Sequence, residues 1–529
     1  MEALDFITIL YAQYLRTLMN TNNIKHFVVV GGGTSGWMTA AALGRVVGTD
    51  NCKVTLIESD EIGTVGVGEA TIPPIVEFNK LLGVNADEML RETQGTFKLG
   101  IEFINWGRIG DAYMHPFGVF GRTIKNVSFW HYWKKAHDLG LSPSLDAYSL
   151  NWSASKSNKF LRGANVSNSP LANIPHAYHF DATLYANFLR NFSTKLGVNR
   201  IEGRVENVHQ NPESGFITGV TLRGGALIEG DFFIDCTGFR GLLIEQTLKT
   251  GYEDWSSYLP CNSAQALPTQ AISPKHPYTK SIAHSAGWQW RIPLQHRTGN
   301  GIVYSTDFTS DEKARETLMK NLPSAAIGEP NQLRFLTGKR KQAWNKNCLA
   351  IGLASGFMEP LESTSIHLVQ SAIMRFFSLL PRKTNFKTEM DRFNSSMDQE
   401  FRTVRDFLIL HYKATERDDS ELWNYCRNMP IPDTLQDKLD LYKSGSWLER
   451  NKQELFGADS WLAVLNGQHI KAKSYSPLVD SIPNKKLERL LSDTRVVIEQ
   501  CATAMPNHED FIKENCFSST PIPVSYTHL

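Results

Sequence analysis

The sequence predicts an α/β protein, in which a parallel-sheet domain is followed by a mainly helical C-terminal module. The first indication is a buried apolar strand, residues 27–30, that runs through a glycine turn into an Ala-rich helix. The second is another apolar strand, residues 53–58, that follows this helix. The third is a stripe of apolar residues that recurs every three or four positions over residues 386–408, the period of an amphipathic helix. Strand, helix and strand together indicate a Rossmann-type βαβ unit.

The glycine turn suggests what this unit binds. The spacing G-x-G-x-x-G and the start of the helix are formed by Gly31, Gly33, Thr34, Ser35 and Gly36. A helix N-terminus offers unpaired N–H groups, and glycines let the backbone approach a pyrophosphate. Glu58 ends the second strand, where a carboxylate accepts from a ribose hydroxyl. We predict a dinucleotide site; the alternative is a tight turn without a ligand.

Composition excludes several classes of protein. The 529-residue chain has a formal net charge of +1, so nucleic acid and anionic lipid are not expected partners. Its seven cysteines include no C-x-x-C pair, which indicates neither a disulfide framework nor a metal site and favours a reducing cytoplasm. Residues 1–20 are apolar but carry Asp5 and Arg16, so no membrane span is predicted there. We expect residues 1–20 and 524–529 to lie outside the folded core.

A second glycine-rich segment follows the βαβ unit. It contains the small residues of a loop that can lie flat against a planar ligand, namely Gly66, Val67, Gly68, Glu69 and Ala70. Pro73 and Pro74 then begin a short helix, residues 75–82, that carries Lys80. Lys80 is either a solvated surface lysine or a residue of the site.

Two later strands also end in glycine turns, at Gly238 and at Gly352. Between the βαβ unit and Gly238 lie short strand-like pieces that begin at Val205 and at Gly219. This arrangement favours a glutathione-reductase-like FAD-binding fold, in which a β-sheet is inserted into the Rossmann unit and distant segments contact the nucleotide. Leu353, next to Gly352, belongs to the same predicted site.

Aromatic and polar clusters complete the candidate site. Residues 95–135 are rich in aromatic side chains and include His115 and Phe117, which form either core or a pocket that stacks a flat ring. Trp288 and Trp290 alternate on one strand, so both rings share a face and fill the core or wall a ligand. Another strand opens into the helix start Pro360, Leu361, Glu362, Ser363, Thr364 and Ser365. Backbone N–H groups at such a start favour an anion, and Glu362 is either a capping acid or a catalytic carboxylate.

Taken together, these stretches resemble the flavin-dependent tryptophan halogenase family. The resemblance covers roughly residues 24–470 and is carried by the following pieces: Gly31–Gly36 with Trp37 and Met38, Gly66–Pro73, His115-x-Phe117, Trp288-x-Trp290-x-Ile292-Pro293 and Glu359–Thr364. The piece at Trp288 is the most specific, because it separates these halogenases from ordinary flavin monooxygenases.

The resemblance implies the following chemistry. A separate NAD(P)H-dependent flavin reductase supplies reduced FAD, and oxygen with chloride or bromide then yields hypohalous acid. This acid passes through an internal tunnel to an electron-rich ring, where a lysine and a glutamate complete the halogenation. The roles fall on Lys80 and Glu362 as catalysts. Ile292 joins the predicted FAD contacts, while His115, Phe117, Pro360, Ser363 and Trp461 are expected to hold the substrate and Thr364 and Ser365 the halide.

Three positions depart from the pattern. Val76 and Glu77 stand where the resemblance places the lysine, so Lys80 is the nearest substitute. Ser365 replaces a glycine of the halide loop, and Phe456 stands where a glutamate would hold the charged end of tryptophan. Indole or another electron-rich ring is therefore as good a candidate substrate as free tryptophan. The alternatives are a monooxygenase that hydroxylates a ring and a non-catalytic flavin-binding protein.

We predict an FAD-binding domain over residues 24–380, in which residues 84–175 contribute an aromatic insertion to the substrate pocket. Residues 381–523 form the mainly helical domain that covers the substrate. A homodimer is compatible with these features.

Overall fold

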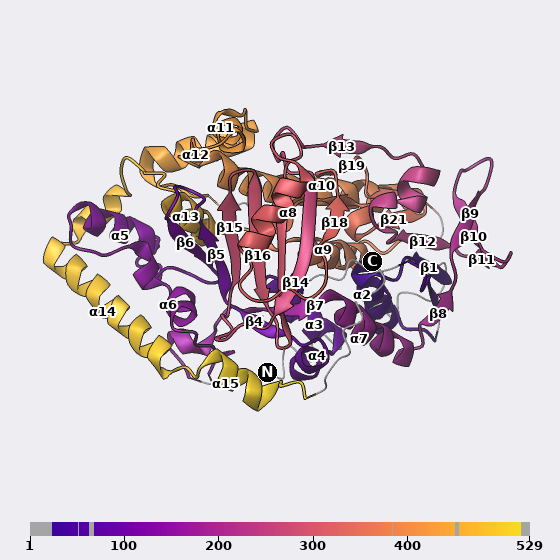
Figure 1. The fold of residues 1–529 in the computed structure, drawn as a ribbon, viewed down its shortest axis with the longest axis horizontal. Helices are drawn as coiled ribbons and strands as arrows, with labels where there is room; N and C mark the ends of the chain where they lie inside the picture. Colours follow the sequence, from indigo (N-terminus) through magenta and orange to yellow (C-terminus); the bar gives the residue numbers. More distant parts are fainter. Residues whose placement is uncertain are drawn as a thin grey trace.

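The computed structural model describes residues 24–50, 52–62, 68–164, 166–382, 385–449 and 454–519 (Figure 1). The predicted end segments 1–20 and 524–529, and the loop residues Gly66 and Val67, lie outside the described residues. Among the described residues, no helix is long and apolar enough to cross a bilayer.

The first sheet is the predicted Rossmann-type core. Its strand order places β1 between β12 and β2, with parallel pairing on both sides. The strands in spatial order are β20 (Trp344–Asn345), β21 (Cys348–Ala350), β12 (Phe232–Asp235), β1 (His26–Val30), β2 (Lys53–Glu58) and β8 (Asn199–Glu202). Most of their side chains are buried, as near-continuous apolar runs in a parallel sheet require.

Helix α2 (Thr34–Ala42) links β1 to β2 and packs against α7 (Ala182–Lys195) and α9 (Ser365–Ser378). Gly31, at the end of β1, has a φ of +113°, and a Cβ there would overlap the carbonyl oxygen of Cys236. Only glycine fits this turn, which confirms the predicted strand–turn–helix unit.

A small sheet of β9 (Val205–Gln210), β10 (Ile217–Leu222) and β11 (Leu227–Glu229) is inserted between β8 and β12. It projects at the right-hand end of the molecule in Figure 1. This insertion is the one expected of a glutathione-reductase-like fold.

The second large sheet forms the middle of the molecule (Figure 1). Its strands in spatial order are β18 (Asn331–Arg334), β14 (Ser263–Gln270), β17 (Arg297–Tyr304), β16 (Gly287–Pro293), β15 (Thr279–His284), β5 (Gly100–Ile104) and β6 (Ala112–Pro116). All neighbours pair antiparallel except β15 and β5. Two further three-stranded sheets are β3 (Gly68–Ala70), β7 (Ala177–Asp181) and β4 (Thr96–Lys98), and β13 (Tyr252–Asp254), β19 (Gly338–Arg340) and β22 (Gly356–Phe357).

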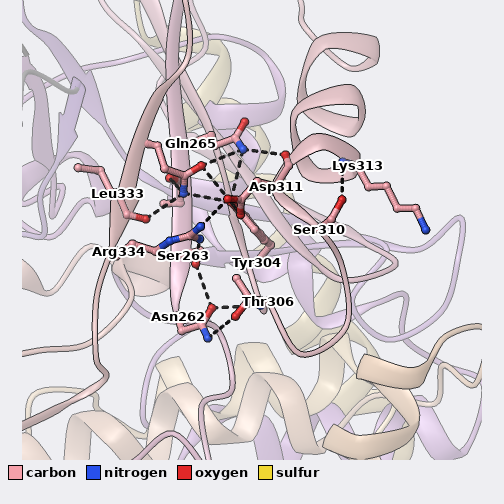
Figure 2. A network of polar contacts seen from close by, with 12 residues as sticks. Asn262, Ser263, Gln265, Tyr304, Thr306, Ser310, Asp311, Lys313, Leu333 and Arg334 are labelled. Carbon is pink, nitrogen blue, oxygen red and sulfur yellow. Dashed lines mark hydrogen bonds and ion pairs between the residues drawn. The ribbon is translucent and has the colours of Figure 1, made fainter.

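A polar network ties one face of this second sheet to helix α8 (Asp311–Lys320) (Figure 2). Tyr304 donates its hydroxyl to Asp311 Oδ1 at 2.6 Å, and Gln265 Nε2 donates to the Asp311 carbonyl at 2.8 Å. Because successive strand residues point to opposite faces, the neighbours Ala264 and Val303 face the other way, into the cavity described below. The network thus holds the two strands that form one wall of that cavity.

The predicted helical module begins with α10 (Lys387–Lys413), whose stripe residues Phe393, Met397, Phe401, Val404 and Leu408 are all buried. The remaining helices of this part are α11 (Glu421–Asn428), α12 (Asp433–Gly445), α13 (Ala458–Gly467), α14 (Asn484–Ala504) and α15 (His508–Asn515). Helix α14 runs back along the outside of α5 (Phe129–Asp138) and α6 (Leu150–Lys156), within the predicted insertion 84–175 (Figure 1). The two other helices near the N-terminus are α3 (Pro74–Leu82) and α4 (Ala86–Glu92).

Candidate active site

A cavity of about 770 Å³ extends from the glycine turn after β1 to the paired tryptophans of β16. Residues predicted from distant parts of the sequence line it together: Gly31, Gly33, Thr34, Ser35, Glu58, Gly68, Glu69, Ala70, Val205, Gly238, Trp288, Ile292, Gly352 and Leu353. Gly36 lies under the turn, where a Cβ would overlap the carbonyl oxygen of Gly31. Seven segments of the chain therefore meet around one cavity.

The end of the cavity at α2 suits a dinucleotide. The N-cap of α2, Gly33, has no side chain to satisfy the first N–H groups of the helix. Glu58 lies across the turn, and its carboxylate accepts from the indole N–H of Trp37 at 3.1 Å and pairs with Arg200. Exposed backbone donors beside a fixed carboxylate match a pyrophosphate and a ribose hydroxyl. The lining residues therefore fit the FAD that the sequence predicts.

The opposite end is walled by aromatic rings. Trp288 and Trp290 share one face of β16, with ring centroids 6.3 Å apart, as the alternation predicts. Glu359 Oε2 fixes Trp288 by accepting from its indole N–H at 2.6 Å, and it also accepts from the Tyr412 hydroxyl at 2.7 Å. Burial raises the pKa of the Glu359 carboxyl to about 7 against these two donors.

Behind this cavity lies a buried polar cluster centred on Glu362. Its Oε2 accepts from His115 Nδ1 at 2.8 Å, and its Oε1 lies 2.8 Å from His411 Nε2. Glu362 and His411 have no exposed side-chain surface. Burial alone raises a carboxyl pKa, but the two histidines outweigh it and lower the pKa of Glu362 to about 2.

Lys98, the last residue of β4, is the lysine of this cluster. Its Nζ donates to Ser363 Oγ at 2.8 Å and to the Thr71 carbonyl at 3.0 Å, and the side chain is fully buried. Burial lowers the pKa of Lys98 to about 7, although the charge of Glu362 opposes this shift. An amine with such a pKa exchanges protons near neutrality.

Lys80, the lysine predicted for this role, is exposed on α3. The buried face of α3 consists of Ile75, Phe78, Asn79 and Leu82, so Lys80 and Glu77 share the face that looks to solvent. The structure therefore places Lys98, and not Lys80, beside Glu362. The sequence signal for Lys98 was a single charged residue between the apolar Phe97 and Leu99. In the structure this residue lies within an uninterrupted run of buried residues.

Ser363 connects the two halves of the site. It lines the large cavity, and its hydroxyl accepts from Lys98. Its φ of +58° is a left-handed conformation that costs a non-glycine residue energy. Such strain persists only where the surroundings impose it and is common at functional sites. Pro360, three residues earlier, also lines the cavity.

The predicted halide residues lie at the start of α9. Thr364 is its N-cap, and the Thr364 hydroxyl is buried without a hydrogen-bond partner. Ser365 begins the helix and lines the cavity. A helix of 14 residues with an unpartnered hydroxyl at its N-terminus offers donors to a small anion.

Aromatic rings surround the other side of Glu362. Lys98 Nζ lies 5.2 Å from the ring centroid of Phe117, and the Phe407 ring lies 5.1 Å from that of Trp461. Phe456 stacks on Phe407 with centroids 3.9 Å apart. The structure thus brings the predicted His115, Phe117 and Trp461 to one cluster and adds Phe407, which the sequence did not single out.

Comparison with known proteins agrees with this arrangement. Residues 26–484 match the family model described as tryptophan halogenase. Tryptophan 6-halogenase ThaL of Streptomyces albogriseolus is 36% identical over 449 residues, which cover 80% of this chain and 83% of ThaL. Among solved structures, Xcc4156, a flavin-dependent halogenase from Xanthomonas campestris, superimposes with a TM-score of 0.92 at 42% identity and covers 94% of this chain and 100% of its own. BrvH, a flavin-dependent halogenase from Brevundimonas sp. BAL3, superimposes with a TM-score of 0.90 at 41% identity. The match covers 93% of this chain and 99% of the BrvH chain.

Proposed function

Since the chain belongs to the tryptophan halogenase family and is a flavin-dependent halogenase, we propose that it halogenates an electron-rich aromatic ring of the indole type with Lys98 and Glu362 as catalytic residues. One observation carries the assignment of these residues. A buried lysine with a lowered pKa and a buried carboxylate lie next to each other behind Ser363, between the large cavity and the aromatic rings.

The large cavity would hold FAD. The N–H groups at the start of α2 would hold its pyrophosphate and Glu58 its ribose, while residues at Gly238, Gly352 and Trp288 would contact the rest of the cofactor. Reduced FAD, together with oxygen and chloride or bromide, supplies hypohalous acid when it is bound. The reductant comes from a separate NAD(P)H-dependent flavin reductase, in keeping with a sequence that shows one dinucleotide fingerprint.

Lys98 would bind the hypohalous acid and protonate its departing oxygen. Its Nζ is the group of the buried cluster that reaches Ser363, whose other side borders the cavity where the acid forms. Because burial lowers the pKa of Lys98 to about 7, the amine can both accept and return a proton near neutrality. Thr364 and Ser365 would hold the halide at the start of α9.

Glu362 would stabilise the cationic ring and take its proton. The carboxylate stays ionised because two histidines flank it, and the ring of one of them, His115, lies 5.7 Å from that of Phe407. His115, Phe117 and Trp461 would hold the substrate by stacking. With Phe456 rather than a glutamate stacked on Phe407, these apolar surroundings would suit an uncharged indole better than a zwitterionic amino acid.

Two alternatives predict different products. A monooxygenase would add oxygen to the ring, and a non-catalytic flavin protein would give no product. The non-catalytic alternative depended on the lysine missing near Val76, and Lys98 removes that argument.

The proposal is tested by incubating the protein with a flavin reductase, NADH, FAD, air, bromide and indole. Mass spectrometry should then show the bromine isotope doublet in the product, and chloride should replace bromide in a parallel reaction. Omission of halide is the control. A product with added oxygen, or none over a broad panel of rings, contradicts the proposal.

A further inference from the structure

His411 is buried on α10, between the backbone of its own helix and the carboxylate of Glu362. Its Nδ1 lies 2.8 Å from the carbonyl oxygen of Phe407, one helical turn earlier. A carbonyl oxygen only accepts, so Nδ1 must carry a hydrogen. In a neutral imidazole, Nε2 would then hold a lone pair.

That nitrogen lies 2.8 Å from Glu362 Oε1. Neither atom makes a well-aligned hydrogen bond, so the contact has the geometry of an ion pair. An unprotonated nitrogen 2.8 Å from a carboxylate oxygen would place two electron-rich atoms in contact, which is strongly unfavourable in a buried site. A second proton on His411 would turn this contact into an attraction between opposite charges.

His115, on the other side of Glu362, makes a different contact. Its Nδ1 donates to Oε2 at 2.8 Å, which one neutral tautomer satisfies. The two histidines thus differ, although both contact the same carboxylate. The asymmetry arises because the Phe407 carbonyl fixes the hydrogen of His411 on the far nitrogen.

Apart from Glu362, the side chains that pack against the His411 imidazole carry no charge. The rings of Phe103 and Trp106 pack against the imidazole, with centroids 4.8 and 6.1 Å away, and carry no charge. Tyr113 is buried nearby, and its hydroxyl accepts from Gln468 Nε2. Lys98 acts on Glu362 from β4.

We propose that His411 is a positioning residue held as an imidazolium, which keeps Glu362 ionised and aimed at the ring. This inference rests on the proposed function. In the reaction, the halogen bonds to a ring carbon, and the electrons of its C–H bond return to the ring as the proton leaves to Glu362. The departing hydroxide takes a proton from Lys98 and becomes water, so that ring and hypohalous acid yield halogenated ring and water.

The first test compares His411→Phe with His411→Gln in the complete chain. Phenylalanine fills the space without a donor, whereas glutamine offers an uncharged N–H to Oε1. We expect H411F to lower kcat for indole bromination at least tenfold and to leave KM unchanged. The amount of hypohalous acid trapped by a soluble β-diketone scavenger should also stay the same. H411Q should recover part of kcat.

A matched control is His367→Gln, which replaces another histidine–glutamate contact of 2.8 Å, this one partly buried, between α9 and Glu400 of α10. H367Q should leave kcat for bromination within twofold. An H411F enzyme as active as the wild type, or one that also loses hypohalous acid formation with no recovery in H411Q, overturns the positioning role. A wild type that brominates no ring contradicts the proposed function instead.

The charge has a spectroscopic signature. In protein labelled with ¹⁵N-histidine, the difference between wild type and H411Q isolates the His411 signals. We expect both ring nitrogens in the protonated range at neutral pH. One unprotonated nitrogen would overturn the imidazolium assignment.

Discussion

Lys98 Nζ lies 2.8 Å from the hydroxyl oxygen of Ser363, although the two residues are 265 positions apart in the sequence. Lys98 ends a strand of the small sheet, and Ser363 lies in the loop before α9. Because Ser363 also borders the large cavity, this hydrogen bond connects the proposed flavin site with the proposed halogenation site.

The first prediction contrasts Lys98→Met with Lys80→Met. Methionine keeps most of the side-chain volume but removes the amine, so K98M should lose about 10²- to 10⁴-fold in kcat for ring bromination, the range for a lost general acid. Trapped hypohalous acid should persist, since the flavin cavity is untouched. K80M should behave as wild type, because Lys80 is exposed on α3. Loss of bromination in K80M alone would restore Lys80 as the catalyst.

The second prediction concerns pH and stability. Burial lowers the pKa of Lys98 from 10.5 to about 7 in the folded protein, so between these values the unfolded chain binds more protons. Stability therefore rises with pH in this window, by at most about 1.4 kcal/mol per pH unit from this group. The difference in Tm between the wild type and K98M should therefore shift in favour of the wild type as the pH rises from 7 to 9. A gap that stays constant or moves the other way contradicts the buried lysine.

The third prediction separates strain from hydrogen bonding at Ser363. Both Ser363→Ala and Ser363→Gly remove the oxygen that accepts from Lys98, so both should lower bromination. Glycine also relieves the left-handed backbone, which costs other residues roughly 1–2 kcal/mol. Thermal unfolding should show S363G to be more stable than S363A by about this amount, which corresponds to a Tm a few degrees higher. Equal stability of the two variants would mean that the backbone at Ser363 is unstrained.

Local patterns predicted much of the fold. The strand, glycine turn and helix at Gly31, the inserted strands after Val205 and the stripe on α10 all depend on neighbouring residues, and the structure contains each of them. The shared face of Trp288 and Trp290 follows from strand geometry alone.

Lys98 and His411 were missed because their roles depend on tertiary contacts. Neither a lysine within an apolar strand nor a histidine within Phe407–Tyr412 reveals its partner, since Glu362 reaches both only after folding. The resemblance placed the lysine on the helix after Pro73, where the side chains of Glu77 and Lys80 point to solvent. Burial, which a single sequence does not display, distinguished the two lysines.

The last prediction concerns substrate choice. Phe456 stacks on Phe407 with centroids 3.9 Å apart, and the Phe407 ring also contacts Trp461. Phe456→Ala removes a stacking partner worth about 0.5–1.5 kcal/mol, so KM for indole should rise roughly two- to tenfold. The space left by the ring should let bulkier 3-substituted indoles compete better with indole. Phe517→Ala is the control, because that side chain is 55% exposed and lies outside the proposed pocket. If F456A changes neither KM nor the ranking of indoles measured in paired competition reactions, Phe456 does not border the substrate.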